Sequence, residues 1–285
     1  MKRRDILTRG ILGGTAALSP AGLVANSPSP FGGAEGTAGQ SRNFVFLHGG
    51  GQGSWVWKRT IAAMAAQSNA QARCLAIDVS GCGTKRGRDT STMAYDDIAR
   101  ELAGEIRAAA IRDAVLVAHS RGGMLAVRMI ELAQELFARV FYVSCSAPLP
   151  GRTLAEAMRD DGAAERPGAA NGTGDPYAAM TKANMSALFC NDMTAVQCDA
   201  FLLQLGNDKW PKSSEIYRDW RYDHLGKIPA VFVHCLQDDA VPPAWQRRFA
   251  ERLRVAKTAH IDAGHQAMIT RPQALAEVLL AESAG

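Results

Sequence analysis

The sequence lacks a strong excess of charge of either sign. Its formal net charge is +4 over 285 residues. Four basic residues against one acidic residue within the first ten positions supply +3 of that charge. The rest of the chain is therefore nearly neutral, which does not indicate a nucleic-acid footprint. We expect no nucleic-acid partner.

Metal-ligand spacings and phosphate-binding loops are also missing. The six cysteines form no C-x-x-C pair and no Cys/His ligand pattern, so we expect no metal site. The chain contains neither G-x-x-x-x-G-K-[ST] nor a G-x-G-x-x-G with an acidic follower, and we expect no cofactor. Cys190 and Cys198 bracket a short segment and can either form a disulfide after export or remain two unpaired thiols at helical spacing.

No apolar run is long enough to span a bilayer stably, and the longest early run, residues 11–25, is short and interrupted. The preceding Arg3-Arg4 pair, followed by Asp5, resembles a twin-arginine export signal, with cleavage after Ala25 or Ala38. Residues 1–40 are thus expected to be a leader and linker of an exported, periplasmic or secreted protein. The alternative is a basic terminus on a cytoplasmic protein.

A strand, a sharp turn and a helix are predicted within residues 114–137. The apolar run ends abruptly at His119-Ser120, and a helix expected to end near Phe137 opens with Gly122-Gly123. In such an elbow the serine is strained and its hydroxyl is lifted out of the sheet edge, so Ser120 is the candidate nucleophile. Ala118 replaces the first glycine of the G-x-S-x-G pattern. The alternative is a serine that only caps the helix.

A glycine-rich turn, H-G-G-G-Q-G, follows a predicted buried strand that begins at Asn43. Its glycines allow the backbone to approach a ligand and turn its N–H groups outward, as an oxyanion requires.

Strands and helices alternate along residues 41–150 and again along 226–285, which predicts a mostly parallel sheet covered by helices on both faces. Between them, residues 151–225 are expected to form a helical cap inserted before the acid-bearing strand. Further strands are predicted at residues 73–78, 139–145, 230–236 and 257–262, and helices at 54–66, 95–110, 177–190, 193–205, 244–253 and 272–282.

Three side chains that suit nucleophilic catalysis each follow the end of a predicted strand. They occur in the order Ser120, Asp238 and His265, and ligands of such sheets bind at the carboxyl ends of the strands. A serine needs a base, and the base needs an orienting carboxylate. Asp238 is preferred over its neighbour Asp239, with Asp262 as a weaker rival.

The segments F-V-F-L-H-G-G-G-Q-G-S-W-V-W, A-H-S-R-G-G-M, C-L-Q-D-D-A-V-P-P-A-W-Q and D-A-G-H-Q-A-M resemble the α/β-hydrolase superfamily. Within it they resemble the plant methyl esterase and hydroxynitrile lyase group with its bacterial esterase relatives. The resemblance implies an α/β-hydrolase fold, with Ser120 as nucleophile, His265 as base and Asp238 as acid. It also implies that the backbone N–H groups of Gly50 and Arg121 form the oxyanion hole.

Ester hydrolysis through an acyl-enzyme is the expected activity, on a small apolar or aromatic ester. The lyases of the resembled group have threonine and lysine where this chain has Gly49 and Gln266, which favours hydrolysis over cyanohydrin cleavage. Lyase-like or perhydrolase chemistry and a small-molecule binding protein remain as alternatives. Apolar cap residues suggest an apolar pocket: Met180, Met185, Leu188, Phe189, Phe201 and Trp210. Arg121 can attract an anionic group at the pocket mouth or contact the cap.

Overall fold

The computed structural model describes residues 42–68, 72–160, 180–205 and 207–283. The chain divides into the units Met1–Ala38 and Gly39–Gly285, and all described residues belong to the second unit. The predicted leader and linker, with the Arg3-Arg4 pair, lie outside the described residues. Within the described ranges no helix is long and apolar enough to cross a membrane.

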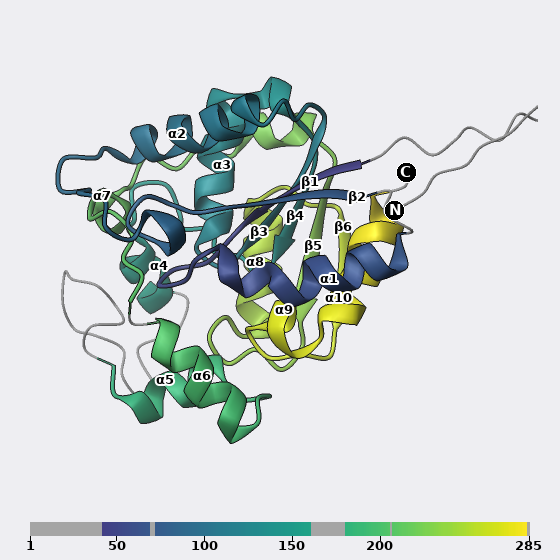
Figure 1. The fold of residues 1–285 in the computed structure, drawn as a ribbon. Coiled ribbons are helices and arrows are strands. Elements are labelled where there is room, and N and C mark those ends of the chain that lie inside the picture. Colours follow the sequence, from purple (N-terminus) through teal and green to yellow (C-terminus); the bar gives the residue numbers. More distant parts are fainter. Residues whose placement is uncertain (1–41, 69–71, 161–179, 206, 284–285) are drawn as a thin grey trace, which may run out of the picture. The chain divides into compact units, whose positions relative to one another are not determined.

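In the described part of the chain, six parallel strands form one sheet in the order β2-β1-β3-β4-β5-β6, which confirms the predicted parallel sheet (Figure 1). The strands are β1 (Arg42–Leu47), β2 (Ala72–Ile77), β3 (Ala114–His119), β4 (Phe137–Val143), β5 (Ala230–Cys235) and β6 (Lys257–Ile261). All residues of β3 are buried, as expected for a strand inside a sheet with both faces covered.

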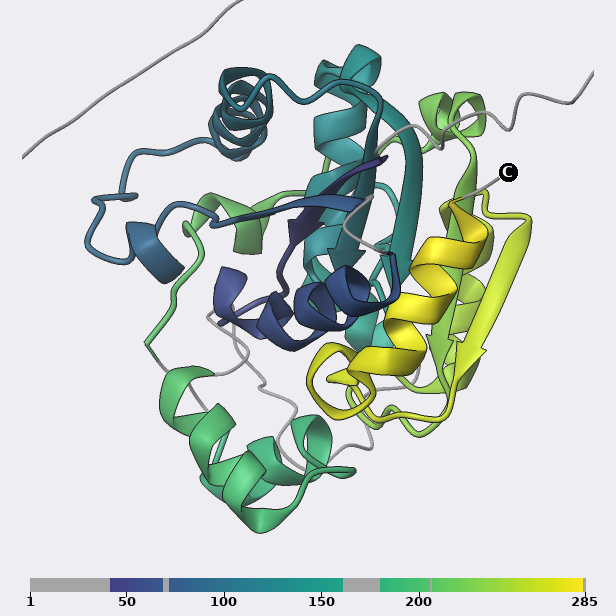
Figure 2. The same cartoon turned by 45° about the vertical axis from the view of Figure 1, so that its right-hand side comes forward.

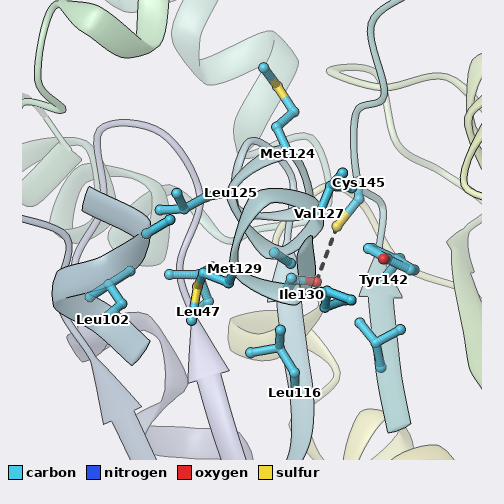
Figure 3. Close-up of a cluster of buried hydrophobic side chains, with 14 of the residues drawn as sticks. Leu47, Leu102, Leu116, Met124, Leu125, Val127, Met129, Ile130, Tyr142 and Cys145 are labelled. Carbon is cyan, nitrogen blue, oxygen red and sulfur yellow. Dashed lines mark hydrogen bonds between the residues drawn. The ribbon is translucent and has the colours of Figure 1, made fainter. Parts of the chain in front are cut away.

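Helices cover both faces of the sheet, as predicted. On β1, Val45 and Leu47 join a core with α2 (Tyr95–Ala108), α3 (Gly122–Leu132) and α8 (Pro243–Arg252). Phe44 and Phe46 point the other way, because strand side chains alternate, toward η1 (Ser54–Trp57), α1 (Lys58–Gln67) and α10 (Pro272–Glu282). Figure 2 shows α1 and α10 side by side, and Figure 3 shows Leu47, Leu102, Leu116 and Met129 packed between strands and helices of the first core.

The helix after Ser120 is shorter than predicted. Helix α3 ends at Leu132, and a short 3-10 turn, η3 (Gln134–Leu136), leads into β4 at Phe137, two residues before the predicted start of that strand. Phe137 pairs with Ala114 across the sheet. The apolar pattern near Phe137 is compatible with a helix or a strand, and pairing with Ala114 makes this residue the start of a strand.

Between β4 and β5 the described chain contains helices and no strand. They are α4 (Leu154–Asp160), α5 (Lys182–Phe189), α6 (Ala195–Leu205), α7 (Ser213–Ile216) and η5 (Asp223–Lys227). Figure 1 shows α5 and α6, in green, as a pair beside the layers of the sheet. Their small apolar cluster includes Phe189 and Phe201 and reaches Ala240 after β5. Both Cys190 and Cys198 are free thiols in this cluster. A short helix, α9 (Ala267–Thr270), follows β6.

Candidate active site

Ser120 lies on a strained turn between β3 and α3. Its φ is 52°, in the left-handed region that non-glycine residues rarely adopt, and its N–H donates to the carbonyl of Val143 at 3.1 Å. The residues after Ser120 must lack side chains, because a Cβ on Gly122 would lie 2.6 Å from the His48 carbonyl oxygen. A Cβ on Gly123 would lie 2.5 Å from that of Cys145. Close approach of strand, loop and helix therefore holds Ser120 at this edge of the sheet.

A chain of hydrogen bonds joins Ser120, His265 and Asp238. The Nδ1 atom of His265 lies 2.6 Å from Oδ2 of Asp238, and its Nε2 atom lies 3.0 Å from Oγ of Ser120. A carboxylate only accepts, so Nδ1 carries the proton and Nε2 is free to accept from the serine hydroxyl. All three side chains are buried. The structure thus brings together three residues that are far apart in the sequence.

Asp238 is held by more than the histidine. Its Oδ1 accepts the Val241 N–H at 2.8 Å, and the Ser144 hydroxyl donates to Oδ2. These donors fix the orientation of the carboxylate. Sequence reasoning missed Ser144, although it directly follows the end of β4 and therefore stands at the same edge of the sheet as the other polar residues.

The other two candidate acids, Asp239 and Asp262, bond to residues other than His265. Asp239 accepts from the Asn191 side-chain amide at 3.1 Å. Asp262 accepts from the side-chain amide of Gln237 at 2.7 Å. Neither bonds to His265 in the described structure, so the geometry favours Asp238 as its orienting acid.

Two further histidines near the serine are neutral. His119 Nε2 donates to the backbone carbonyl of His265 at 2.9 Å, and the two rings lie 4.6 Å apart. Burial lowers the pKa of His119 well below its usual value, and the nearby His265 adds to this effect. Burial also lowers the pKa of His48, against the raising effects of its hydrogen bond to the Gly49 carbonyl and of Asp78. Both therefore position backbone without adding charge at neutral pH.

The glycine-rich loop after β1 is tied to the His265 loop by two glutamines. The N–H of Gly49 donates to Gln52 Oε1 at 3.2 Å, and Gln52 Nε2 donates to Gln266 Oε1 at 3.0 Å. From the segment between β4 and β5, the indole N–H of Trp210 donates to the Gly49 carbonyl at 3.2 Å. This network joins the loop before Gly50 to the residue after His265.

Gly50 and Arg121 lie outside the helices and strands, so their backbone N–H groups take no part in the hydrogen bonds of regular secondary structure. Across the residues that the structure describes, neither N–H donates to a protein acceptor. A backbone N–H without a protein acceptor is free to bond to water or to a ligand oxygen. No group of three or more His, Cys, Asp or Glu side chains in the described ranges is placed to hold a metal ion.

The fold and this edge of the sheet agree with the comparison to known families. A sequence model described as the alpha/beta hydrolase family matches residues 44–278. This range spans most of the chain, and the protein belongs to that family. The α/β-hydrolase fold expected from the sequence motifs is confirmed.

The chain is similar to several plant proteins. The chain is 36% identical over 124 residues to the probable esterase PIR7A of Oryza sativa subsp. indica, an alignment that covers 41% of this chain and 46% of the relative. Longer alignments link it to polyneuridine aldehyde esterase of Rauvolfia serpentina, 24% identical over 85% of this chain and 96% of the relative. Methylesterase 7 of Arabidopsis thaliana is 23% identical over 84% and 95%. The resemblance to the plant methyl esterase group is thus confirmed.

A solved structure gives the same answer for the fold. The crystal structure of polyneuridine aldehyde esterase superposes with a TM-score of 0.67, covering 86% of this chain and 100% of that one at 20% identity.

Proposed function

We propose that the protein is a carboxylic ester hydrolase that works through an acyl-enzyme intermediate on a small-molecule ester. The observation that carries this proposal is the hydrogen-bonded path from Asp238 through His265 to Ser120. The names of the relatives, which are esterases and a methylesterase, support ester hydrolysis in general. An apolar or aromatic ester fits the apolar cap residues Phe189 and Phe201, the first of which packs 5.5 Å from the His265 ring.

Proton transfer begins the proposed reaction. Nε2 of His265 takes the hydroxyl proton as Ser120 Oγ attacks the ester carbonyl carbon. The imidazolium then donates that proton to the departing alcohol oxygen, and the acyl group stays on Ser120. Water, deprotonated by the same nitrogen, attacks the acyl-enzyme and releases the acid. Asp238 keeps Nδ1 protonated and stabilises the imidazolium in both halves.

The oxyanion formed in each half is assigned to the backbone N–H groups of Gly50 and Arg121. Both lack a protein acceptor in the described chain, and the Gly122–His48 contact brings their two segments together. One such donor is typically worth about 2.7–4 kcal/mol of transition-state stabilisation. These donors are backbone atoms, which a side-chain substitution cannot remove. The proposal is therefore tested with a variant of the nucleophile.

The test is Ser120→Ala, assayed with p-nitrophenyl acetate and butyrate. Loss of the nucleophile is expected to lower kcat by at least about a thousandfold, because the remaining oxyanion donors cannot replace covalent catalysis. Wild-type turnover by the folded variant would overturn the assignment. A serine-directed fluorophosphonate should label wild type at Ser120, and absence of labelling would favour a binding protein.

Lyase chemistry is tested by cyanide release from a cyanohydrin. At the position after His265 the chain has the neutral amide of Gln266, which bonds Gln52. No cation therefore stands at this position to stabilise departing cyanide, and we expect no release.

Export is a separate proposal, supported by the Arg3-Arg4 pair and the weakly apolar run that follows it. Replacing both arginines with lysine is expected to leave the protein in the cytoplasm. Unchanged export would contradict the twin-arginine assignment.

A further inference from the structure

The side chain of Arg121 is a buried cation with few partners. Only 4% of the residue is exposed. Its Nη2 donates to the Ser214 hydroxyl at 2.9 Å, and the guanidinium carbon lies 5.3 Å from the centre of the Trp210 ring. A guanidinium has five N–H donors, and this is the one hydrogen bond that it makes to the described residues. Its Nε is fully enclosed and has no acceptor there.

No carboxylate neutralises this cation within the described chain. Asp208, two residues before Trp210, is already bonded by Arg86 at 3.0 Å and by the Gly83 N–H at 2.7 Å. Arg128 on α3, the helix that begins after Arg121, shows the usual arrangement, because it is less buried and pairs with both Asp96 and Glu131. Burying a charge without a counter-ion is costly, and the Trp210 ring offsets only part of that cost. Among the described residues the guanidinium is thus left with N–H groups free to bind an anion.

Trp210 links the guanidinium to the loop of the proposed oxyanion hole. Arg121 directly follows Ser120, and its ring partner Trp210 donates to the Gly49 carbonyl and lies edge-on to His48, 5.9 Å between ring centres. An anion held by Arg121 would thus belong to a molecule that also reaches the serine. A carboxylate matches the planar fork of an arginine and can accept two parallel N–H bonds.

We propose that Arg121 is a specificity-determining subsite for a carboxylate on the substrate, so that the preferred substrates are esters with a second, ionised carboxyl group. This inference rests on the proposed ester hydrolysis. The cap contributes through Ser214 and Trp210, which orient the guanidinium. Ser214 is itself fixed, since its hydroxyl donates to the Pro211 carbonyl at 2.5 Å.

The test compares matched charged and neutral esters. Monomethyl glutarate and its amide analogue place the charge on the acyl side, and the butyrate ester of glycolic acid and its amide analogue place it on the alcohol side. For at least one pair, wild type is expected to prefer the anionic ester, and Arg121→Met is expected to lower that preference by at least about tenfold, mainly through KM. Arg121→Lys keeps the positive charge but loses the planar guanidinium. Its preference for the anionic ester should lie between those of wild type and Arg121→Met.

The control is Lys212→Met, which deletes an exposed cation from the same cap segment and should leave the preference unchanged. An equal loss on charged and neutral esters in Arg121→Met would overturn the subsite, because it would indicate a structural role or an effect on the oxyanion alone. Absence of any anionic preference in wild type for both pairs would overturn it too.

A second measurement uses only the wild-type protein and so does not depend on whether an Arg121 variant folds. With p-nitrophenyl butyrate as reporter, glutarate should inhibit wild type competitively, at least about tenfold more strongly than glutaramide. Equal inhibition by the two would contradict the subsite. Neither result alters the Ser120→Ala test, so failure of this inference is distinguishable from failure of the proposed function.

Discussion

Asp192, in the turn between α5 and α6, accepts a hydrogen bond at 2.9 Å from the backbone N–H of Gly264, the residue before His265. Its side chain is only 3% exposed. The adjacent Asn191 donates to the Gln237 carbonyl at 2.5 Å, on the loop that bears Asp238. One turn of the inserted helices therefore contacts both loops that supply the proposed acid and base.

Loss of this contact should reduce turnover. Asp192→Ala removes the acceptor of the Gly264 N–H, and we expect kcat on aryl esters to fall by about tenfold to a hundredfold because the His265 loop loses its position. Asp192→Asn keeps an acceptor oxygen of the same size and should retain most activity. Steady-state kinetics with thermal melting of both variants checks this. Wild-type kcat in Asp192→Ala would contradict the positioning role.

A side chain at position 264 should displace the α5–α6 turn or the histidine loop. A Cβ there would lie 2.3 Å from Asn191 Oδ1 and 2.6 Å from Asp192 Oδ1. Gly264→Ala is therefore expected to cost about 1–3 kcal/mol of stability and to lower kcat, since either the turn or the histidine loop must move. Gly226→Ala is the matched control, because a Cβ at that position meets nothing within 4 Å. Urea unfolding and ester kinetics compare the two; equal behaviour would refute the steric account.

Ser144→Ala tests the support of the acid. The variant removes the hydroxyl that donates to Asp238 Oδ2. A buried carboxylate that loses a donor costs about 1–3 kcal/mol, and a less firmly oriented Asp238 should reduce kcat more than it changes KM. Ser144 is fully buried with a φ of 44°, which disfavours a β-branched residue, so the control is Ser144→Cys, whose small side chain keeps a weak donor and should retain more activity. Equal kcat for Ser144→Ala and wild type would show that the His265 and Val241 contacts suffice.

Acid should destabilise the fold through His48. Its Nε2 accepts the Val79 N–H at 3.1 Å, and burial lowers its pKa in the folded state. Below about pH 6.5 the unfolded chain binds a proton that the folded chain does not. The free energy of unfolding therefore falls as pH drops below that value, by up to about 1.4 kcal/mol per pH unit for each such histidine.

Urea unfolding between pH 8 and 5.5 measures this slope. His48→Gln supplies an acceptor that does not titrate in this range, and it should reduce the slope while His119, also neutral by burial, maintains part of it. An unchanged slope in His48→Gln would contradict the contribution of His48.

Although it did not predict α4, α7 or α9, the sequence by itself determined the six strands, the main helices between them, the parallel sheet and the candidate residues Ser120, Asp238 and His265. These follow from local signals, because apolar runs, glycine pairs and chain order are properties of neighbouring residues. The end of α3 was predicted wrongly, near Phe137, because the apolar pattern there suits a helix or a strand until Phe137 of β4 pairs with Ala114 of β3.

Tertiary structure decided what long-range contact controls. It distinguished Asp238 from Asp239, because adjacent loop residues face different partners, His265 and Asn191. It also explains the glycine at position 264, because side chains of the α5–α6 turn occupy the space that a Cβ would need. That Arg121 has no counter-ion among the described residues is likewise invisible in the sequence, because such pairing depends on which distant side chains the fold brings to it.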